Sequence, residues 1–202
     1  MSLTATPNGD RVQIAIFGRR NAGKSSVINA VTGQQLAIVS DVKGTTTDPV
    51  YKAMEILPIG PCMFIDTPGL DDEGALGRMR VEKAIEVLNR TDIAMLVLDI
   101  SRLTKQELES GRGMGGEEEQ ILAMIEEKKL PYVIVLNQAD KLSGEELTHR
   151  RQCIMAKNGT VPVCAVSTVQ NMGLDALKDA LVMLAPDTDL KLSLIHISEP
   201  TR

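Results

Sequence analysis

The clearest chemical signal in the chain is the run GRRNAGKS at residues 18–25, which matches the pattern GxxxxGK[ST]. Glycines let a backbone wrap closely around phosphate groups, and a helix N-terminus behind such a loop adds partial positive charge. Lys24 is expected to reach the β- and γ-phosphates of a nucleoside triphosphate, and the Ser25 hydroxyl to hold Mg²⁺. The run therefore predicts a phosphate loop. The residues expected to contact a nucleotide here are Arg19, Arg20, Asn21, Ala22, Gly23, Lys24, Ser25 and Ser26.

Two later runs carry groups that could complete a magnesium and γ-phosphate site. In the polar run GTTTD at 44–48, Thr45 and Thr46 could contact the nucleotide, and Thr46 could ligate Mg²⁺. In the run DTPG at 66–69, Asp66 could hold Mg²⁺ through water, and the Gly69 N–H could contact the γ-phosphate. Either run alone could be an ordinary polar turn, and only their order and spacing after the phosphate loop favour the functional interpretation.

A third pair of runs could recognise a base. The run NQAD at 137–140 offers Asn137, Gln138 and the Asp140 carboxylate, which could accept from guanine N1–H and N2–H₂. Adenine does not present these two donors together, so a carboxylate at this place predicts guanine selectivity. Ser167 and Thr168 follow the sixth expected strand, where backbone N–H groups could contact guanine O6.

These groups need a scaffold that alternates strands and helices. Apolar runs that fit strands are 11–17, 49–57, 61–66, 93–98, 132–136 and 161–166. Stretches that fit helices are 24–32, 79–89, 117–128, 144–156 and 174–184. The second and third strands are separated only by a turn at 58–61, so they should pair antiparallel. We therefore predict an α/β phosphate-loop fold in three layers, with a mostly parallel six-stranded sheet, one antiparallel edge strand and helices on both faces.

Ligands of such sheets bind outside the carboxyl ends of the strands. The phosphate loop, Asp66, Asn137 and Ser167 each lie at the carboxyl end of a predicted strand, so they are expected to meet at one edge. The glycine-rich run GRGMGG at 111–116 follows no strand directly, and we interpret it as a loop before a helix rather than a second phosphate loop.

Composition narrows the class of protein. The chain has 202 residues, is 43% apolar and 24% charged, and carries a net charge of −5, which fits one folded domain with no general attraction to nucleic acid. It holds no run of about 18 apolar residues, so we expect no membrane segment. Three cysteines without a CxxC pair suggest reduced thiols and a cytoplasmic location.

The two ends of the chain do not fit the alternating pattern. Residues 1–10 are expected to be a flexible lead-in, 11–186 a nucleotide-binding domain, and 187–202 a tail. The last ten residues, SLIHISEPTR, resemble translated adapter sequence, so 193–202 are interpreted as non-native.

Taken in order, GRRNAGKS, GTTTD, DTPG, NQAD and VST resemble the translation-factor-related GTPases, in the branch of the Era and MnmE proteins. More narrowly, AIVSDVKGTTTDPVYKAMEILPIGP and FIDTPGLDDEGALGRMRVEKA resemble the GTPase domain of the HydF family of [FeFe]-hydrogenase maturation factors. That resemblance implies a GTP-binding and GTP-hydrolysing switch acting in hydrogenase cofactor maturation. Its implied partners are GTP and GDP, other maturases and the apo-hydrogenase, and its iron–sulfur cluster would lie only in a region downstream of this chain.

The resemblance also implies a mechanism. Leu70 stands where many GTPases have a water-orienting glutamine, so hydrolysis should be slow. Members of this branch often use K⁺ at the phosphates, held by an asparagine that matches Asn21 and by backbone oxygens around 40–42. Asn21 could instead only shape the loop. Gln138 replaces the usual lysine of NKxD, which should lower affinity. The residues implied in catalysis are Lys24, Asn21, Thr46 and Gly69.

Two alternatives remain open at this level. The chain could be a nucleotide-gated scaffold in which hydrolysis is incidental, or an Era- or MnmE-like GTPase linked to RNA modification or ribosome assembly. The acidic balance of the chain weighs against RNA binding by this segment itself. Some relatives pair their GTPase domains face to face, so a homodimer is a further possibility.

Overall fold

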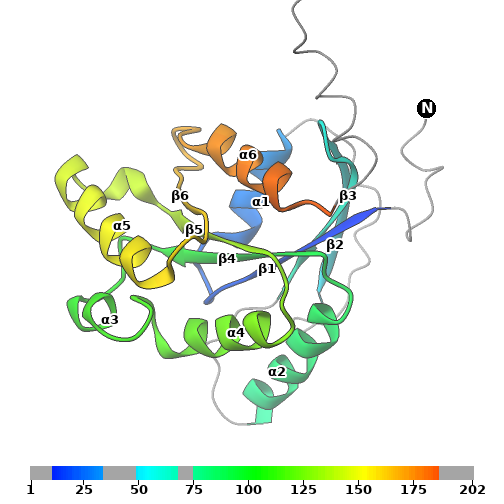
Figure 1. Cartoon of the computed structure of the whole chain (residues 1–202), viewed down its shortest axis with the longest axis horizontal. Coiled ribbons are helices and arrows are strands. Elements are labelled where there is room, and N and C mark those ends of the chain that lie inside the picture. Colours follow the sequence, from blue (N-terminus) through cyan, green and yellow to red (C-terminus); the bar gives the residue numbers. More distant parts are fainter. Residues whose placement is uncertain (1–10, 34–48, 68–74, 187–202) are drawn as a thin grey trace, which may run out of the picture.

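The computed structural model describes residues 11–33, 49–67 and 75–186, of which 75–81 are described by their backbone only. These residues form a central six-stranded sheet covered by helices on both faces (Figure 1). The strands are β1 (Val12–Phe17), β2 (Val50–Ile56), β3 (Gly60–Asp66), β4 (Ile93–Asp99), β5 (Tyr132–Asn137) and β6 (Val163–Ala165). The helices are α1 (Lys24–Thr32), α2 (Ala75–Leu88), α3 (Lys105–Glu109), α4 (Gly116–Glu127), α5 (Gly144–Asn158) and α6 (Leu174–Leu184).

The sheet has the strand order β2-β3-β1-β4-β5-β6. All neighbours run parallel except β2 and β3, which pair antiparallel in the register Val50 opposite Asp66. This confirms the predicted fold, including the single antiparallel strand at one edge. The antiparallel pairing follows from the short β2–β3 connection, which leaves no room for a crossover helix.

Each central strand is buried on both faces because its side chains alternate between two cores. Along β4, for example, Ile93, Met95 and Val97 belong to one core, whereas Ala94, Leu96 and Leu98 belong to the other. Helices α1 and α6 cover the first core, and α2, α3, α4 and α5 cover the second (Figure 1). This explains why the central strands read as continuous apolar runs in the sequence.

Two short elements were not predicted from the periodicity of the sequence. Helix α3 has only five residues and depends on a capping box between Thr104 and Glu107. A 3₁₀ turn, η3 (Ala139–Lys141), follows β5 and carries Asp140. Both are too short to produce a helical repeat of apolar residues.

Cys62 and Cys164 are buried in the cores and Cys153 is half-buried, all three as free thiols. Burial raises the pKa of the Cys62 thiol to about 11, so this thiol stays protonated and packs as a small apolar group. Among the described residues, no helix is both long and apolar enough to cross a membrane.

Candidate functional site

The loop between β1 and α1 packs tightly against the sheet because two of its glycines lie close to atoms of β4 and β5. Gly18 has φ +147°, and a Cβ atom there would lie 2.2 Å from the Val97 carbonyl oxygen on β4. Gly23 has φ +88° and caps α1, and a Cβ atom there would lie 2.2 Å from Asn137 Nδ2. A side chain at either position would therefore force the loop away from the sheet.

Lys24 is the first residue of α1, and its side chain folds back over the loop. The residue is only 8% exposed, and Nζ donates to the carbonyl oxygens of Gly18 at 2.9 Å and Arg19 at 3.0 Å. The ammonium group is thus held inside the curl, at the N-terminus of α1, where an anion is also favoured by the helix dipole.

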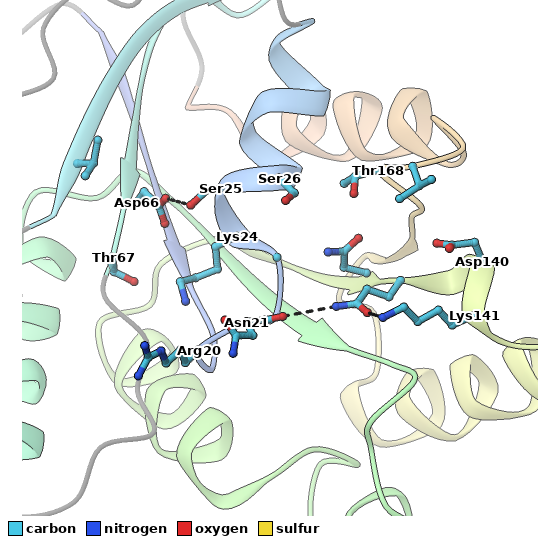
Figure 2. Close-up of a pocket in the computed structure, with 15 residues that line it drawn as sticks. Arg20, Asn21, Lys24, Ser25, Ser26, Asp66, Thr67, Asp140, Lys141 and Thr168 are labelled. Carbon is cyan, nitrogen blue, oxygen red and sulfur yellow. Dashed lines mark hydrogen bonds between the residues drawn. The ribbon is translucent and has the colours of Figure 1, made fainter. Parts of the chain in front are cut away.

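The two described residues predicted to hold Mg²⁺ lie in direct contact. Ser25 Oγ donates to Asp66 Oδ2 at 2.5 Å, which joins the start of α1 to the end of β3 (Figure 2). A hydroxyl and a carboxylate are hard oxygen donors, and this donor set fits Mg²⁺. The neighbouring Thr67 is buried and donates from Oγ1 to the Ile16 carbonyl at 2.5 Å, which fixes the chain that leaves β3.

On the other side of the pocket, the run 137–140 is tied to the phosphate loop. Asn137 is 1% exposed, and its Nδ2 donates to the Ala22 carbonyl at 2.9 Å. Gln138 has φ +63°, and its Nε2 donates to the Asn21 carbonyl at 3.4 Å, while Lys141 Nζ donates to Gln138 Oε1. The run 137–140 thus supports the phosphate loop as well as lining the pocket.

The last predicted run, which begins at Ser167, forms hydrogen bonds within the connection between β6 and α6. Ser167 is fully buried, exchanges two backbone hydrogen bonds with Met172 at 3.0 Å each, and accepts at Oγ from the Gln170 N–H at 3.1 Å. Its side chain therefore stabilises the β6–α6 connection. The next residue, Thr168, lines the pocket instead (Figure 2).

One pocket of about 660 Å³ joins these elements at the carboxyl edge of the sheet (Figure 2). Lys24 from the phosphate loop and Asp140 from the run 137–140 line this same cavity. Predicted site residues that line it are Arg20, Asn21, Gly23, Lys24, Ser25, Ser26, Asp66, Asn137, Gln138, Asp140 and Thr168. Val50, Thr67, Lys141 and Val169 also line it and were not predicted.

The remaining predicted residues fall into two groups. Thr45, Thr46, Gly69, the backbone around 40–42 and Leu70 lie outside the described residues. Arg19, Ala22 and Ser167 are described but do not contribute to the lining of the pocket. Ala22 is buried beneath the loop, where its carbonyl accepts from Asn137.

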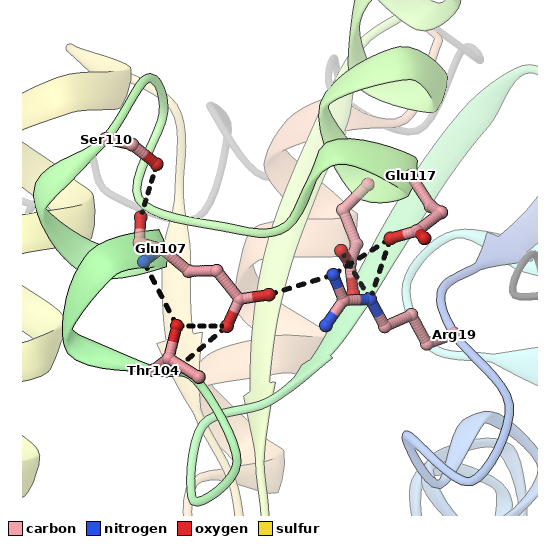
Figure 3. A network of polar contacts seen from close by, with 6 residues as sticks. Arg19, Thr104, Glu107, Ser110 and Glu117 are labelled. Carbon is pink, nitrogen blue, oxygen red and sulfur yellow. Dashed lines mark hydrogen bonds and ion pairs between the residues drawn. The ribbon is translucent and has the colours of Figure 1, made fainter.

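The Arg19 side chain is held by three carboxylates of the α3–α4 region (Figure 3). Its Nη2 lies 2.9 Å from both Glu107 Oε1 and Glu117 Oε2, and its Nε lies 3.0 Å from Glu118 Oε2. Gly115 permits this approach, since a Cβ atom there would lie 1.5 Å from Arg19 Nη2. The guanidinium therefore anchors the phosphate loop to α3 and α4.

The charges of this cluster shift one another's pKa values. Burial alone would lower the pKa of Arg19, but the charge of Glu118 and the hydrogen bonds that Arg19 donates to Glu107 and Glu117 raise it overall. Burial raises the pKa of Glu118 to about 7, although the Arg19 charge opposes this shift. For Glu107, burial is outweighed by hydrogen bonds from Thr104 and by Arg19, so its pKa is lowered.

Comparison with known proteins identifies the family. The family model described as "50S ribosome-binding GTPase" matches residues 13–138 of this chain, which include the phosphate loop and Asn137. The chain belongs to this GTPase family. It is a GTP-binding and GTP-hydrolysing domain of the Era, Der and MnmE type.

Curated relatives match most of this chain. GTPase Der of Kosmotoga olearia is 28% identical over 194 residues, which cover 91% of this chain and 41% of that protein. The tRNA modification GTPase MnmE of Alkaliphilus oremlandii is 33% identical over 168 residues, which cover 82% and 32%. GTPase Era of Heliobacterium modesticaldum is 30% identical over 178 residues, which cover 88% and 56%. The GTPase chain thus spans about a third to somewhat over half the length of these relatives.

A solved structure shows the same fold. Era of Aquifex aeolicus bound to GDP and AlF₄⁻ matches with a TM-score of 0.68 and 24% identity, covering 87% of this chain and 57% of that one.

Proposed function

We propose that this GTPase is a slowly hydrolysing nucleotide switch, in which Lys24 and the loop amides hold the phosphates and Asp140 selects guanine. The observation that carries this proposal is the continuous pocket shared by Lys24 and Asp140. Ser25 and Asp66, which are already in contact, would hold Mg²⁺. When bound, this ion would act as a Lewis acid that offsets the negative charge of the phosphate oxygens. Lys24 would leave its carbonyl partners for the phosphates, and the backbone amides of the loop would donate to the phosphate oxygens.

Calorimetry and turnover together test this proposal. The wild-type chain should bind GDP and GTP with Mg²⁺, bind ATP far more weakly, and release phosphate slowly from GTP. Lys24→Ala should lose binding, whereas Lys105→Ala, which changes a lysine whose side chain is 89% exposed on α3, should behave as wild type. Equal affinity for ATP and GTP would contradict the assignment of Asp140.

Hydrolysis is proposed to be stimulated by K⁺ held at Asn21. Asn21 lines the pocket in a left-handed backbone conformation, with φ +61°, and its carbonyl is fixed by Gln138. Non-glycine residues held in this conformation cluster at functional sites. Turnover should therefore be faster in K⁺ than in Na⁺ at matched ionic strength, and the difference should disappear in Asn21→Ala.

Two cellular roles can be separated by experiment. A role linked to RNA is favoured by the similarity to Der, MnmE and Era, one of which is named as a tRNA modification GTPase. A role in [FeFe]-hydrogenase maturation is supported by the resemblance of the runs around GTTTD and DTPG to HydF. Deleting the gene and assaying hydrogenase activity, tRNA modification and ribosome assembly distinguishes these roles, since each predicts a different defect.

The same strain separates a switch from a scaffold. A variant that binds GTP but no longer hydrolyses it should fail to restore function if turnover is the signal. Restoration by that variant would favour a nucleotide-gated scaffold.

A further inference from the structure

Two adjacent arginines of the phosphate loop face different surroundings. Arg19 is anchored by Glu107, Glu117 and Glu118. Arg20, in contrast, is exposed and lines the nucleotide pocket. Figure 2 shows Arg20 on the same side of the pocket as Lys24 and Thr67, with Asp140 on the far side. The sequence GRR does not show which of the two arginines contacts the acids of α3 and α4, whereas the structure does.

The pocket assigns its two ends to different parts of a nucleotide. Asp140 marks the end that takes the base, and Lys24, Ser25 and Asp66 mark the end that takes the phosphates and Mg²⁺. A nucleotide whose base contacts Asp140 must extend its phosphate chain toward Lys24. Arg20 lies at this phosphate end, so the last phosphate of a triphosphate is the group that it would meet.

We propose that Arg20 is a catalytic residue of this GTPase, a loop arginine that contacts the γ-phosphate and stabilises the charge that develops on it during hydrolysis. This inference rests on the proposed GTP hydrolysis and adds a residue to it. A guanidinium is always protonated and matches phosphate oxygens with paired donors. Because it belongs to the loop itself, Arg20 requires no partner protein to supply it.

The backbone that carries Arg20 is fixed on both sides by contacts of its neighbours. On one side the loop is fixed by the Arg19 guanidinium, which bridges to α3 and α4. On the other side the Asn21 carbonyl accepts from Gln138, and the Ala22 carbonyl accepts from the buried Asn137. The backbone on both sides of Arg20 is therefore positioned before substrate binds, and such preorganised charge is what lowers a barrier.

In the reaction, a water oxygen forms a bond to the γ-phosphorus while the bond from that phosphorus to the β,γ-bridging oxygen breaks. The products are GDP and inorganic phosphate, and the protons of the water end on the phosphate and in solvent. Negative charge is spread over the γ-phosphate oxygens and the bridging oxygen during this step. Arg20 would neutralise charge on the γ-phosphate oxygens, whereas Lys24 spans the β- and γ-phosphates.

Single-turnover and steady-state kinetics of Arg20 variants test the proposal. Because supplied arginines contribute a factor of about 10³ to 10⁵ in other GTPases, we expect Arg20→Gln to lower kcat by at least about tenfold. Affinity for GDP, which lacks the γ-phosphate, should change by less than about threefold. Affinity for a non-hydrolysable GTP analogue should fall more than affinity for GDP. Arg20→Lys should retain part of the rate, and Arg90→Gln, on an exposed arginine after α2, serves as the matched control.

Chemical rescue separates a catalytic role from a structural one. Millimolar guanidinium should restore part of the turnover of Arg20→Ala, whereas the same concentration of NaCl should not. Unchanged kcat in Arg20→Gln would overturn the proposal, and so would an equal loss of GDP affinity and kcat without rescue. If the wild-type chain itself hydrolysed no GTP, the proposed function would fail first, and that result differs from wild-type turnover that is insensitive to Arg20.

Discussion

Glu118 provides the sharpest test of the electrostatics around the phosphate loop. This glutamate lies in the first turn of α4 and is 2% exposed. Its Oε2 atom lies 3.0 Å from Arg19 Nε but without the alignment of a hydrogen bond. Glu107 from α3 and Glu117 from α4 bring two more negative charges to the same guanidinium. The single positive charge of Arg19 is thus shared by three carboxylates, and Glu118 is the most deeply buried of them.

The expected effect is a stability that falls as the pH rises. Burial raises the Glu118 pKa from 4.5 to about 7, so between these values the folded protein binds a proton that the unfolded chain has released. The free energy of unfolding must then decrease with pH across this window and level off above about pH 7. At about 1.4 kcal/mol per pKa unit, this single group removes about 2 to 3 kcal/mol between pH 5 and pH 8.

Urea unfolding of the wild type and of Glu118→Gln at several pH values from 5 to 8 measures this effect. Glutamine cannot titrate, so the stability of the variant relative to the wild type should increase by about 2 to 3 kcal/mol over that range. A difference that stays constant with pH, or a carboxyl carbon of Glu118 that titrates near pH 4.5 in NMR spectra, would refute the reasoning.

Three further changes probe the pocket. Gly23→Ala should weaken GDP binding more than tenfold, because an alanine in the αL conformation costs about 1 to 2 kcal/mol and its Cβ would clash with Asn137. Gly144→Ala, which has no atom near its Cβ position, is the control in the same calorimetric assay. Asn137→Ala should destabilise the fold by about 1 to 3 kcal/mol in urea, since the buried Ala22 carbonyl loses its donor, and GDP affinity should fall with it. Rates of phosphate release in K⁺ and Na⁺ should differ for the wild type but not for Asn21→Ala, and equal rates in the wild type would remove Asn21 from the cation site.

The arrangement of the pocket was predictable because parallel strands share one carboxyl edge. Each of the runs beginning at Gly18, Asp66, Asn137 and Ser167 lies at the carboxyl end of an apolar strand, so their convergence followed from topology alone. The boundaries of α1 and α6 were also predicted correctly, since Gly33 ends one helix and both carry clear apolar periodicity.

Contacts between distant residues were not predictable from the sequence. Arg19 and Glu117 are 98 positions apart, and no local pattern marks them as partners. Asn137 was predicted from its type and place to contact the base, but the sequence gives no sign that its amide also donates to the Ala22 carbonyl, 115 positions away. Such roles depend on tertiary geometry rather than on residue type or spacing.

The central claim is that one nucleotide bridges the phosphate loop and Asp140, and the nucleotide preference of Asp140→Asn tests it most directly. Guanine offers an amino group at C2, whereas xanthine offers a carbonyl oxygen to which an asparagine amide can donate. Calorimetry with GDP and XDP should show the wild type preferring GDP, and Asp140→Asn losing at least about tenfold in GDP affinity while gaining affinity for XDP. If the variant kept the wild-type preference, Asp140 would not contact the base and the pocket would not be occupied as described.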